Sequence, residues 1–271
     1  HEETNAKSNF TSVIVQLFVI NIVFSLDSVI TAIGMTDILA VMVAAVVLSR
    51  PRHGAIEAGG KYFFLSALSV AFLLMGLAYI YGATGTLDLA EVALAVQSAG
   101  ADAKLLVFGM VFLIVGLAFK LGIVPFHMWI PDVYHGAPVA TTLFISSVPK
   151  MAAFAMAIRL LQTGLGALHD DWSQMLAVLA MLSIVLGNLA AIAQSNIKRM
   201  LAYSTISHMG FMLLALMSGV VAGDSHYMIN AYSSAMYYVV AYVLMSLGAF
   251  GMILLLSRAG FEAEHLDDFK G

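Results

Sequence analysis

The chain is a series of long apolar stretches separated by short polar ones. A helix needs about 20 apolar residues to cross the hydrocarbon core of a bilayer. Seven stretches approach or exceed that length, whereas an eighth, Ile38–Leu48, suits only a half-helix or a truncated span. The alternating pattern of a membrane β-barrel is absent, which leaves helices. The seven long stretches are Thr11–Ile33, Tyr62–Tyr81, Leu105–Val124, Pro138–Leu161, Trp172–Gln194, Met200–Val221 and Tyr227–Ser257.

One predicted helix is interrupted. Leu105–Val124 runs into Pro125 and then Pro131, and proline lacks the N–H of a helix bond and clashes with the preceding turn. We expect the helix to end or unwind by Pro125, and Pro131 to prevent a straight continuation. Because Pro131 separates His127 from His135, an interfacial position is favoured for both over metal ligation. The expected fold class is an all-α polytopic membrane bundle of seven to eight transmembrane helices, one broken near Pro125.

Composition supports a membrane protein. Of the 271 residues, 61% are hydrophobic and 10% are charged, against about 45–50% and about 25% in soluble domains. A soluble enzyme and a disordered tail are excluded. Nucleic acid is not an expected partner, because 12 Lys and Arg against 16 Asp and Glu leave no basic surface for phosphates. The chain has no cysteine, which excludes disulfides and thiolate-bound metals, and no cofactor is expected.

Lysine and arginine predict the orientation in the bilayer, since cytoplasmic loops are enriched in both. If all eight segments cross and the N-terminus is cytoplasmic, only Lys104 and Arg159 lie near the outer ends. If Ile38–Leu48 does not cross, the N-terminus moves outside and the other seven spans keep their orientation. When all eight segments cross, the residues predicted on the cytoplasmic side are Lys7, Arg50, Arg52, Lys61, Lys198, Arg199, Arg258 and Lys270.

Lys150 is the strongest candidate for a functional residue, because charges inside hydrocarbon are rare and usually functional. It lies twelve residues into its span, or ~18 Å deep at the helical rise, near the midplane. Pro149 frees a carbonyl one turn earlier, and Ser146 and Ser147 in the same turn could hold water. A static buried ion pair is the alternative interpretation.

Three further ionisable residues lie within predicted spans. Lys120 is fifteen residues into its span, where snorkelling toward the inner interface is the alternative. His208 shares a helix face with Ser204 at i, i+4, and hydrogen-bonded packing is the alternative to proton exchange. Asp27 could bind a cation or a proton, and packing is the alternative. No other metal ligand is predicted.

Several motifs between Glu57 and Gly271 belong together. They are Lys61–Phe63, Tyr81–Gly85, Gly116–Lys120, Val124–Asp132, Gly136–Pro138, Val148–Lys150, Gln194–Gly210 and Asp267–Gly271. In combination they resemble the antiporter-like subunit N of the proton-pumping NADH:quinone oxidoreductase, or complex I. The resemblance extends over most of the chain and is specific, because it rests on many motifs in the same order.

This resemblance implies a role in proton translocation. By motif position, Lys120 looks like the family's first central lysine and Lys150 like the second, which passes protons along the membrane midplane. His208 would lie further along the same polar axis. The chain would be a non-redox subunit of a translocase in the cell inner membrane. Its implied partners are other membrane subunits of a respiratory complex and the lipid bilayer, and protons would be the transported species.

The first 52 residues suggest a different family. Phe24–Ala32, followed by Gly34 and Met35, resembles TerC-like integral membrane proteins, although Asn21 stands where that family typically has an aspartate. We therefore expect a chimera whose seam is near Arg50–Gly54, with a TerC-like fragment over 1–52 and a partial subunit N-type domain over 53–271. A TerC-like ion or metal transporter centred on Asp27, and a membrane fragment without transport activity, are the alternative functions.

Overall fold

The computed structural model describes residues 53–98, 102–218, 228–257 and 265–269. Contacts between Cα atoms divide the chain into two compact units, residues 1–53 and residues 54–271. Apart from His53, every described residue belongs to the second unit. The predicted spans Thr11–Ile33 and Ile38–Leu48, Asp27 and the predicted TerC-like motif lie outside the described residues.

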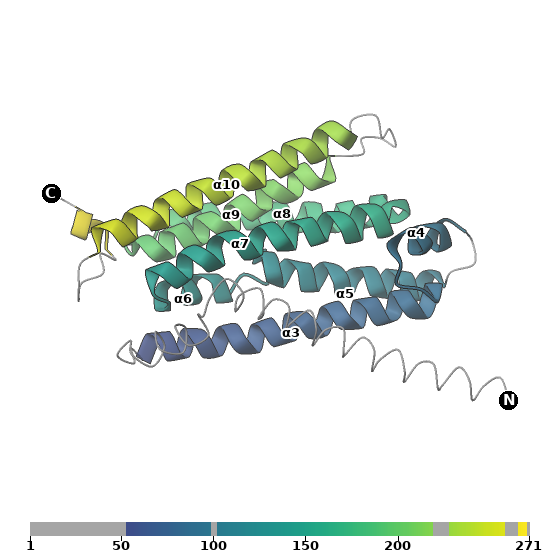
Figure 1. Ribbon diagram of the computed structural model, residues 1–271, viewed down its shortest axis with the longest axis horizontal. Coiled ribbons are helices and arrows are strands. Elements are labelled where there is room, and N and C mark those ends of the chain that lie inside the picture. Colours follow the sequence, from purple (N-terminus) through teal and green to yellow (C-terminus); the bar gives the residue numbers. More distant parts are fainter. Residues whose placement is uncertain (1–52, 99–101, 219–227, 258–264, 270–271) are drawn as a thin grey trace, which may run out of the picture. The chain divides into compact units, whose positions relative to one another are not determined.

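Six helices in the described part are long and apolar enough to cross a membrane. They confirm six predicted spans and, with them, the all-α membrane fold class (Figure 1). Apart from short helices and turns, the only other regular feature described is an isolated β-bridge between Asn196 and His265. The long helices are α3 (His53–Thr84), α5 (Ala103–Leu121), α7 (Val139–Ala157) with the π-helix η1 (Ile158–Gly164), α8 (His169–Ile192), α9 (Ile197–Met217) and α10 (Met228–Leu256). The short ones are α4 (Leu89–Gln97), α6 (Trp129–Gly136), η2 (Gly166–Leu168) and η3 (Leu266–Phe269).

Capping side chains fix the starts of three helices. The first backbone N–H groups of a helix have no partner within it, and a side-chain oxygen at the N-cap accepts from them. Asp88 accepts two such bonds at α4, and Asp102 accepts two at α5. Asn196 accepts from the N–H of Arg199 at α9. The chain therefore enters these helices at defined residues.

Small residues let α8 and α9 pack closely. A Cβ added at Gly187 would lie 2.7 Å from the backbone nitrogen of Ser207, and one at Gly210 would lie 2.9 Å from the carbonyl oxygen of Ala180. Close backbone approach is a main source of helix association in lipid, where apolar side chains gain little by leaving the hydrocarbon. On the other side of α9, α10 packs along α7 (Figure 1). This arrangement brings α7, α9 and α10 together around polar side chains.

The outward faces of α8 and α10 are apolar. Large hydrophobic side chains stand exposed along both helices, whereas a water-soluble protein rarely exposes so large a contiguous apolar patch. These faces suit contact with lipid or with other membrane helices. They include Val178, Met181, Leu182, Val185, Leu189 and Ile192 on α8, and Tyr237, Val240, Leu244, Met245, Met252 and Leu255 on α10.

The predicted helix break is confirmed. α5 ends at Leu121, and Gly122 adopts a left-handed conformation with φ of 75°. The following Ile123 N–H bonds back to the carbonyl of Ala118, as in a Schellman motif. A turn then leads to α6, which begins at Trp129. Pro131 is within the first turn of α6, where its missing N–H is not needed, so the interruption precedes Pro131 and does not depend on it.

Candidate functional site

A buried ammonium lies at the break. Lys150 of α7 is 1% exposed. Its Nζ donates to the carbonyl oxygen of Leu121 at 2.7 Å and to that of Lys120 at 3.3 Å. The ring of Trp129, from the first turn of α6, lies 4.8 Å from Nζ at its centroid, within the range of a cation–π contact. Lys150 therefore joins α7 to both halves of the broken helix.

Backbone geometry explains why a cation fits there. The last carbonyls of a helix carry a partial negative charge and lack partners within the helix. The Schellman bonds from Ile123 and Gly122 take up the carbonyls of Ala118 and Phe119, and Lys150 takes up the two that follow. Among the described residues no carboxylate forms an ion pair with Lys150. The ammonium is held by neutral dipoles, not by the static ion pair considered from sequence.

Side chains from other elements satisfy the remaining polar groups of the break. The hydroxyl of Ser183 on α8 accepts from the Val124 N–H at 3.0 Å and donates to the Leu179 carbonyl at 2.7 Å. The indole N–H of Trp129 donates to the Phe119 carbonyl at 2.9 Å. Irregular backbone at membrane depth requires such partners. Side chains of α8 and α6 therefore stabilise the break.

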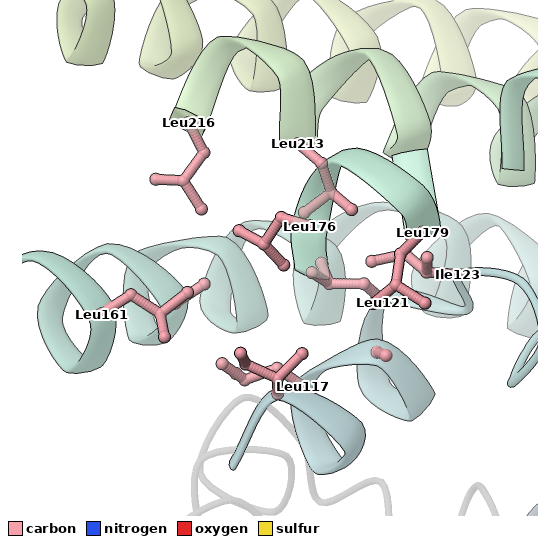
Figure 2. A pocket seen from close by; sticks show the side chains of 11 residues that line it. Leu117, Leu121, Ile123, Leu161, Leu176, Leu179, Leu213 and Leu216 are labelled. Carbon is pink, nitrogen blue, oxygen red and sulfur yellow. The ribbon is translucent and has the colours of Figure 1, made fainter. Parts of the chain in front are cut away.

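A small apolar cavity adjoins the break (Figure 2). Leucines of α5, η1, α8 and α9 surround it, among them Leu117, Leu161, Leu176 and Leu213, and Leu121 also lines it. Its volume of about 10 Å³ is at the lower limit for one water molecule. Since a buried water also needs polar partners and the lining side chains are all apolar, this cavity offers no binding site for a water beside the carbonyls that hold Lys150.

Lys120 contributes to this site through its backbone. It lies in the last turn of α5, and its side chain is half-buried. The carbonyl of Lys120, not its ammonium, contacts Lys150. The structure thus brings the two predicted lysines together at one break.

The predicted residue His208 lies in a second polar cluster, between α9 and α10. Its Nδ1 is 2.7 Å from the hydroxyl oxygen of Tyr238, and its ring centroid lies 5.5 Å from that of Tyr242. The Tyr242 hydroxyl is 3.0 Å from Thr205 Oγ1 and 3.2 Å from the carbonyl oxygen of Ser146. Ser146 is one turn before Lys150, so Tyr242 connects the His208 cluster to the helix of the buried lysine.

Charged side chains hold α6 at the end of the bundle predicted to face the cytoplasm. Asp132 of α6 pairs with Lys61 of α3 at 2.8 Å and with Arg199 of α9 at 3.2 Å. The buried Lys198 donates to the carbonyl of Ala137, just after α6, at 3.3 Å. Two consecutive residues of α9 thus contact both ends of α6 and fix the second half of the broken helix.

The ion pairs determine the pKa of Asp132. Burial alone would raise this pKa, but the hydrogen bonds from Lys61 and Arg199 outweigh burial and hold it below the usual 3.8. The bonds to Asp132 and Glu57 raise the pKa of Lys61 from 10.5 to about 12. Stability from Asp132 is therefore present above pH 3.8 and is lost as pH falls through its lowered pKa. Stability from Lys61 is present below pH 10.5 and is lost as pH rises through about 12.

Asp132→Asn should lower the stability of the protein at neutral pH by about 1 kcal/mol, because partly exposed ion pairs contribute at most about that much. The difference from wild type should shrink as pH falls below 3.8 and through the lowered pKa of Asp132, because the wild-type carboxylate then becomes neutral too. Thermal unfolding in detergent at pH 7 and pH 3 measures both effects. Asp171→Asn is the matched control, because Asp171 is exposed in the first turn of α8; an equal loss in both variants would contradict the role of Asp132.

Sequence reasoning missed Tyr238, Tyr242 and Ser183 as site residues. Tyr238 and Tyr242 are four residues apart and share a face of α10, so a polar pair at helical spacing was the available signal. No comparable signal identifies Ser183, because its partner at Val124 is 59 positions away. His127 is in the break and His135 in the last turn of α6. The described residues include no group of three His, Cys, Asp or Glu able to hold a metal ion.

The described fold and site define a polytopic membrane bundle in which one helix is broken and its last carbonyls hold a buried lysine. The profile of the NADH:quinone oxidoreductase/Mrp antiporter transmembrane family matches residues 26–271, and the chain belongs to this family. It is 59% identical over 239 residues to the NADH-quinone oxidoreductase subunit N of Azoarcus sp. strain BH72, covering 88% of this chain and 49% of that protein. The chain spans about half the length of the curated relatives it matches.

Solved structures agree with the family. A chain of respiratory complex I from Thermus thermophilus is 40% identical, with a TM-score of 0.59 over 75% of this chain and 41% of that chain. A chain of the archaeal membrane-bound sulfane sulfur reductase is 29% identical, with a TM-score of 0.68 over 82% of this chain and 44% of that chain. Six helices of the described part are long and apolar enough to cross a membrane, and the chain is a multi-pass protein of the inner membrane.

The family match bears on the first 52 residues. It begins at residue 26, upstream of the predicted seam at Arg50–Gly54. Nothing in the comparisons supports a TerC-like segment or a chimera. Both stay predictions, as does the ion site at Asp27, which lies outside the described residues.

Proposed function

We propose that the chain is part of a proton-translocating membrane subunit of an NADH:quinone oxidoreductase. The observation that carries the proposal is the fully buried Lys150 held by two backbone carbonyls at a broken helix. Removal from water disfavours the charged form of a lysine, and a carboxylate partner would counteract that effect. An ammonium held by carbonyl dipoles and an aromatic ring, with no carboxylate paired to it among the described residues, can release a proton and take it back.

The proposed proton path follows the polar residues of the bundle. Lys120 and Lys150 exchange protons at the break between α5 and α6, and His208 exchanges them further along, between α9 and α10. The link through Tyr242 and Ser146 supports this order. The chain acts without a redox centre of its own, and electron transfer takes place in other subunits. Its partners are the other membrane subunits of that complex and the surrounding lipid.

Proton flux through the reconstituted chain tests the proposal. The purified full chain is placed in liposomes that contain a pH-sensitive dye, and a potassium diffusion potential drives protons inward. We expect liposomes with the folded chain to show more flux than protein-free liposomes. After heat unfolding of the chain, the flux should equal that of protein-free liposomes. Flux no greater than that of protein-free liposomes, with the helices intact by circular dichroism, would contradict the proposal.

The organisation of the chain around residue 52 has its own test. A TerC-like fragment over 1–52 joined to a partial antiporter-like domain over 53–271 remains a proposal. Genomic or transcript reads that run through positions 50–57 decide whether the junction is natural. Reads that break there would establish an artificial fusion, whereas continuous reads would exclude an assembly error.

A further inference from the structure

The chain has two tryptophans, and each donates its indole N–H to a backbone carbonyl at an interruption between helices. Trp129 of α6 bonds to the carbonyl of Phe119, near the end of α5, at 2.9 Å. Trp172 of α8 bonds to the carbonyl of Leu165, between η1 and η2, at 3.1 Å. Both side chains are buried. In the described part of the chain, the Trp129 ring alone also lies beside an ammonium, that of Lys150.

Three contacts hold the Trp129 ring in place. The indole N–H bond ties it to α5, and the ring of Tyr62 on α3 lies 5.2 Å from it, centroid to centroid. One turn further along α6, Asp132 pairs with Lys61, the residue before Tyr62. Trp129 and Asp132 are at i and i+3, on one face of α6, so two consecutive residues of α3 hold that face. The ring beside Lys150 therefore has little freedom to move away.

The ring responds to the charge of Lys150 in a way that the carbonyl bonds do not. Nζ lies 4.8 Å from the centroid of Trp129, and an aromatic face attracts a full positive charge. A neutral amine still has N–H groups to donate to the carbonyls of Lys120 and Leu121, but it has no net charge for the ring to attract. The ring contact therefore favours the charged form, and burial of both groups strengthens it.

We propose that Trp129 is a positioning residue, which holds the charged form of Lys150 at the break through the face of its ring. Without the ring, the ammonium keeps the two carbonyls but can also take other positions in the break. Misplacement of a reacting group by about 1 Å can lower a rate by about 100-fold. The contact between ring and charge stands on the geometry of the break, and its effect on transport rests on the proposed function.

A double-mutant cycle measures the contact without reference to transport. Denaturant unfolding of the full chain in detergent compares wild type, Trp129→Leu, Lys150→Met and the double variant. Residues in contact couple in such a cycle. Because a desolvated cation–π contact is stronger than an exposed one, we expect the two changes to couple by about tenfold or more in the unfolding equilibrium constant. Should Trp129→Leu not fold, the cycle with Trp129→Phe decides, with a smaller coupling, since tryptophan attracts a cation better than phenylalanine.

Trp172→Leu is the matched control. It removes a buried indole with the same kind of backbone bond, and no lysine contacts Trp172 among the described residues. Its effect on stability should therefore add to that of Lys150→Met without coupling. Additive effects of Trp129→Leu and Lys150→Met, or equal coupling at both tryptophans, would overturn the inference.

Proton flux in the liposome assay tests the positioning role. We expect Trp129→Leu to lower flux by about tenfold or more, Trp129→Phe to keep most of it, and Trp172→Leu to match wild type. Both Trp129 variants lose the indole bond to Phe119, so recovery by phenylalanine identifies the ring face as the cause. Unchanged flux in Trp129→Leu, or an equal loss in both Trp129 variants, overturns the positioning role. If wild type carries no flux, the proposed function fails, and the double-mutant cycle still decides the contact.

Discussion

Arginine in place of Lys150 should stop proton flux while leaving the break folded. Arginine keeps a positive charge and hydrogen-bond donors for the two carbonyls, but it does not release its proton in proteins. If Lys150 exchanges protons, flux through the reconstituted chain should fall by about 100-fold or more. The liposome assay with a potassium diffusion potential measures this decrease, and circular dichroism confirms the helical content.

Lys104→Arg is the matched control for this change. Lys104 is in the first turn of α5 and is exposed, so the same substitution there should leave both flux and stability at wild-type values. A Lys150→Arg chain that conducts protons as fast as the control would show that Lys150 holds the break together without exchanging protons. Loss of flux in both variants would point to a general effect of arginine on reconstitution.

Lys150→Met separates the structural role of the ammonium from its chemistry. Methionine fills a similar volume but leaves the carbonyls of Lys120 and Leu121 without their donor, and a buried unsatisfied group costs about 1–3 kcal/mol. Stability should therefore fall in Lys150→Met and hold in Lys150→Arg, whereas flux should fall in both.

The sequence predicted the elements well, because each span is a local signal. Six helices match predicted stretches, and Pro125, shortly after Leu121, located the break. The position of Lys150 in the middle of its helix also follows from counting residues. What the sequence could not predict is the partner of that lysine. Its acceptors are carbonyls about 30 positions earlier, and any carbonyl in the chain has the same chemistry.

The contacts of α10 could not be predicted from the sequence for the same reason. Its sequence reads as a long apolar span, and helical spacing places Tyr238 and Tyr242 on one face without saying what that face meets. Only packing against α7 and α9 shows that Tyr242 contacts Ser146 and that Tyr238 contacts His208. Similarly, Asp132 was predicted only as part of a motif, and its ion pairs join residues 67 and 71 positions apart.

Gly122→Ala should strongly destabilise the break. Gly122 has φ of 75°, a conformation that costs a non-glycine residue about 1–2 kcal/mol. An added Cβ would also overlap the side chain of Ile130 and lie 3.4 Å from Lys150 Nζ, and overpacking of this kind costs about 1–3 kcal/mol. We expect a loss of about 3 kcal/mol in the free energy of unfolding, measured by thermal or denaturant unfolding in detergent.

Gly85→Ala provides a control with nearly the same backbone and none of the crowding. Its φ is 74°, and nothing lies within 4 Å of an added Cβ. The control should therefore lose only the conformational part, about 1–2 kcal/mol, and the difference between the two variants measures the crowding at the break. Because the added Cβ would contact both Ile130 and the Lys150 ammonium, Gly122→Ala should also displace Lys150 from the two carbonyls that it binds and reduce proton flux. Gly85→Ala should leave proton flux unchanged. Equal destabilisation by the two alanines, with flux intact in both, would show that the break tolerates a side chain at Gly122 and that its tight turn does not position Lys150.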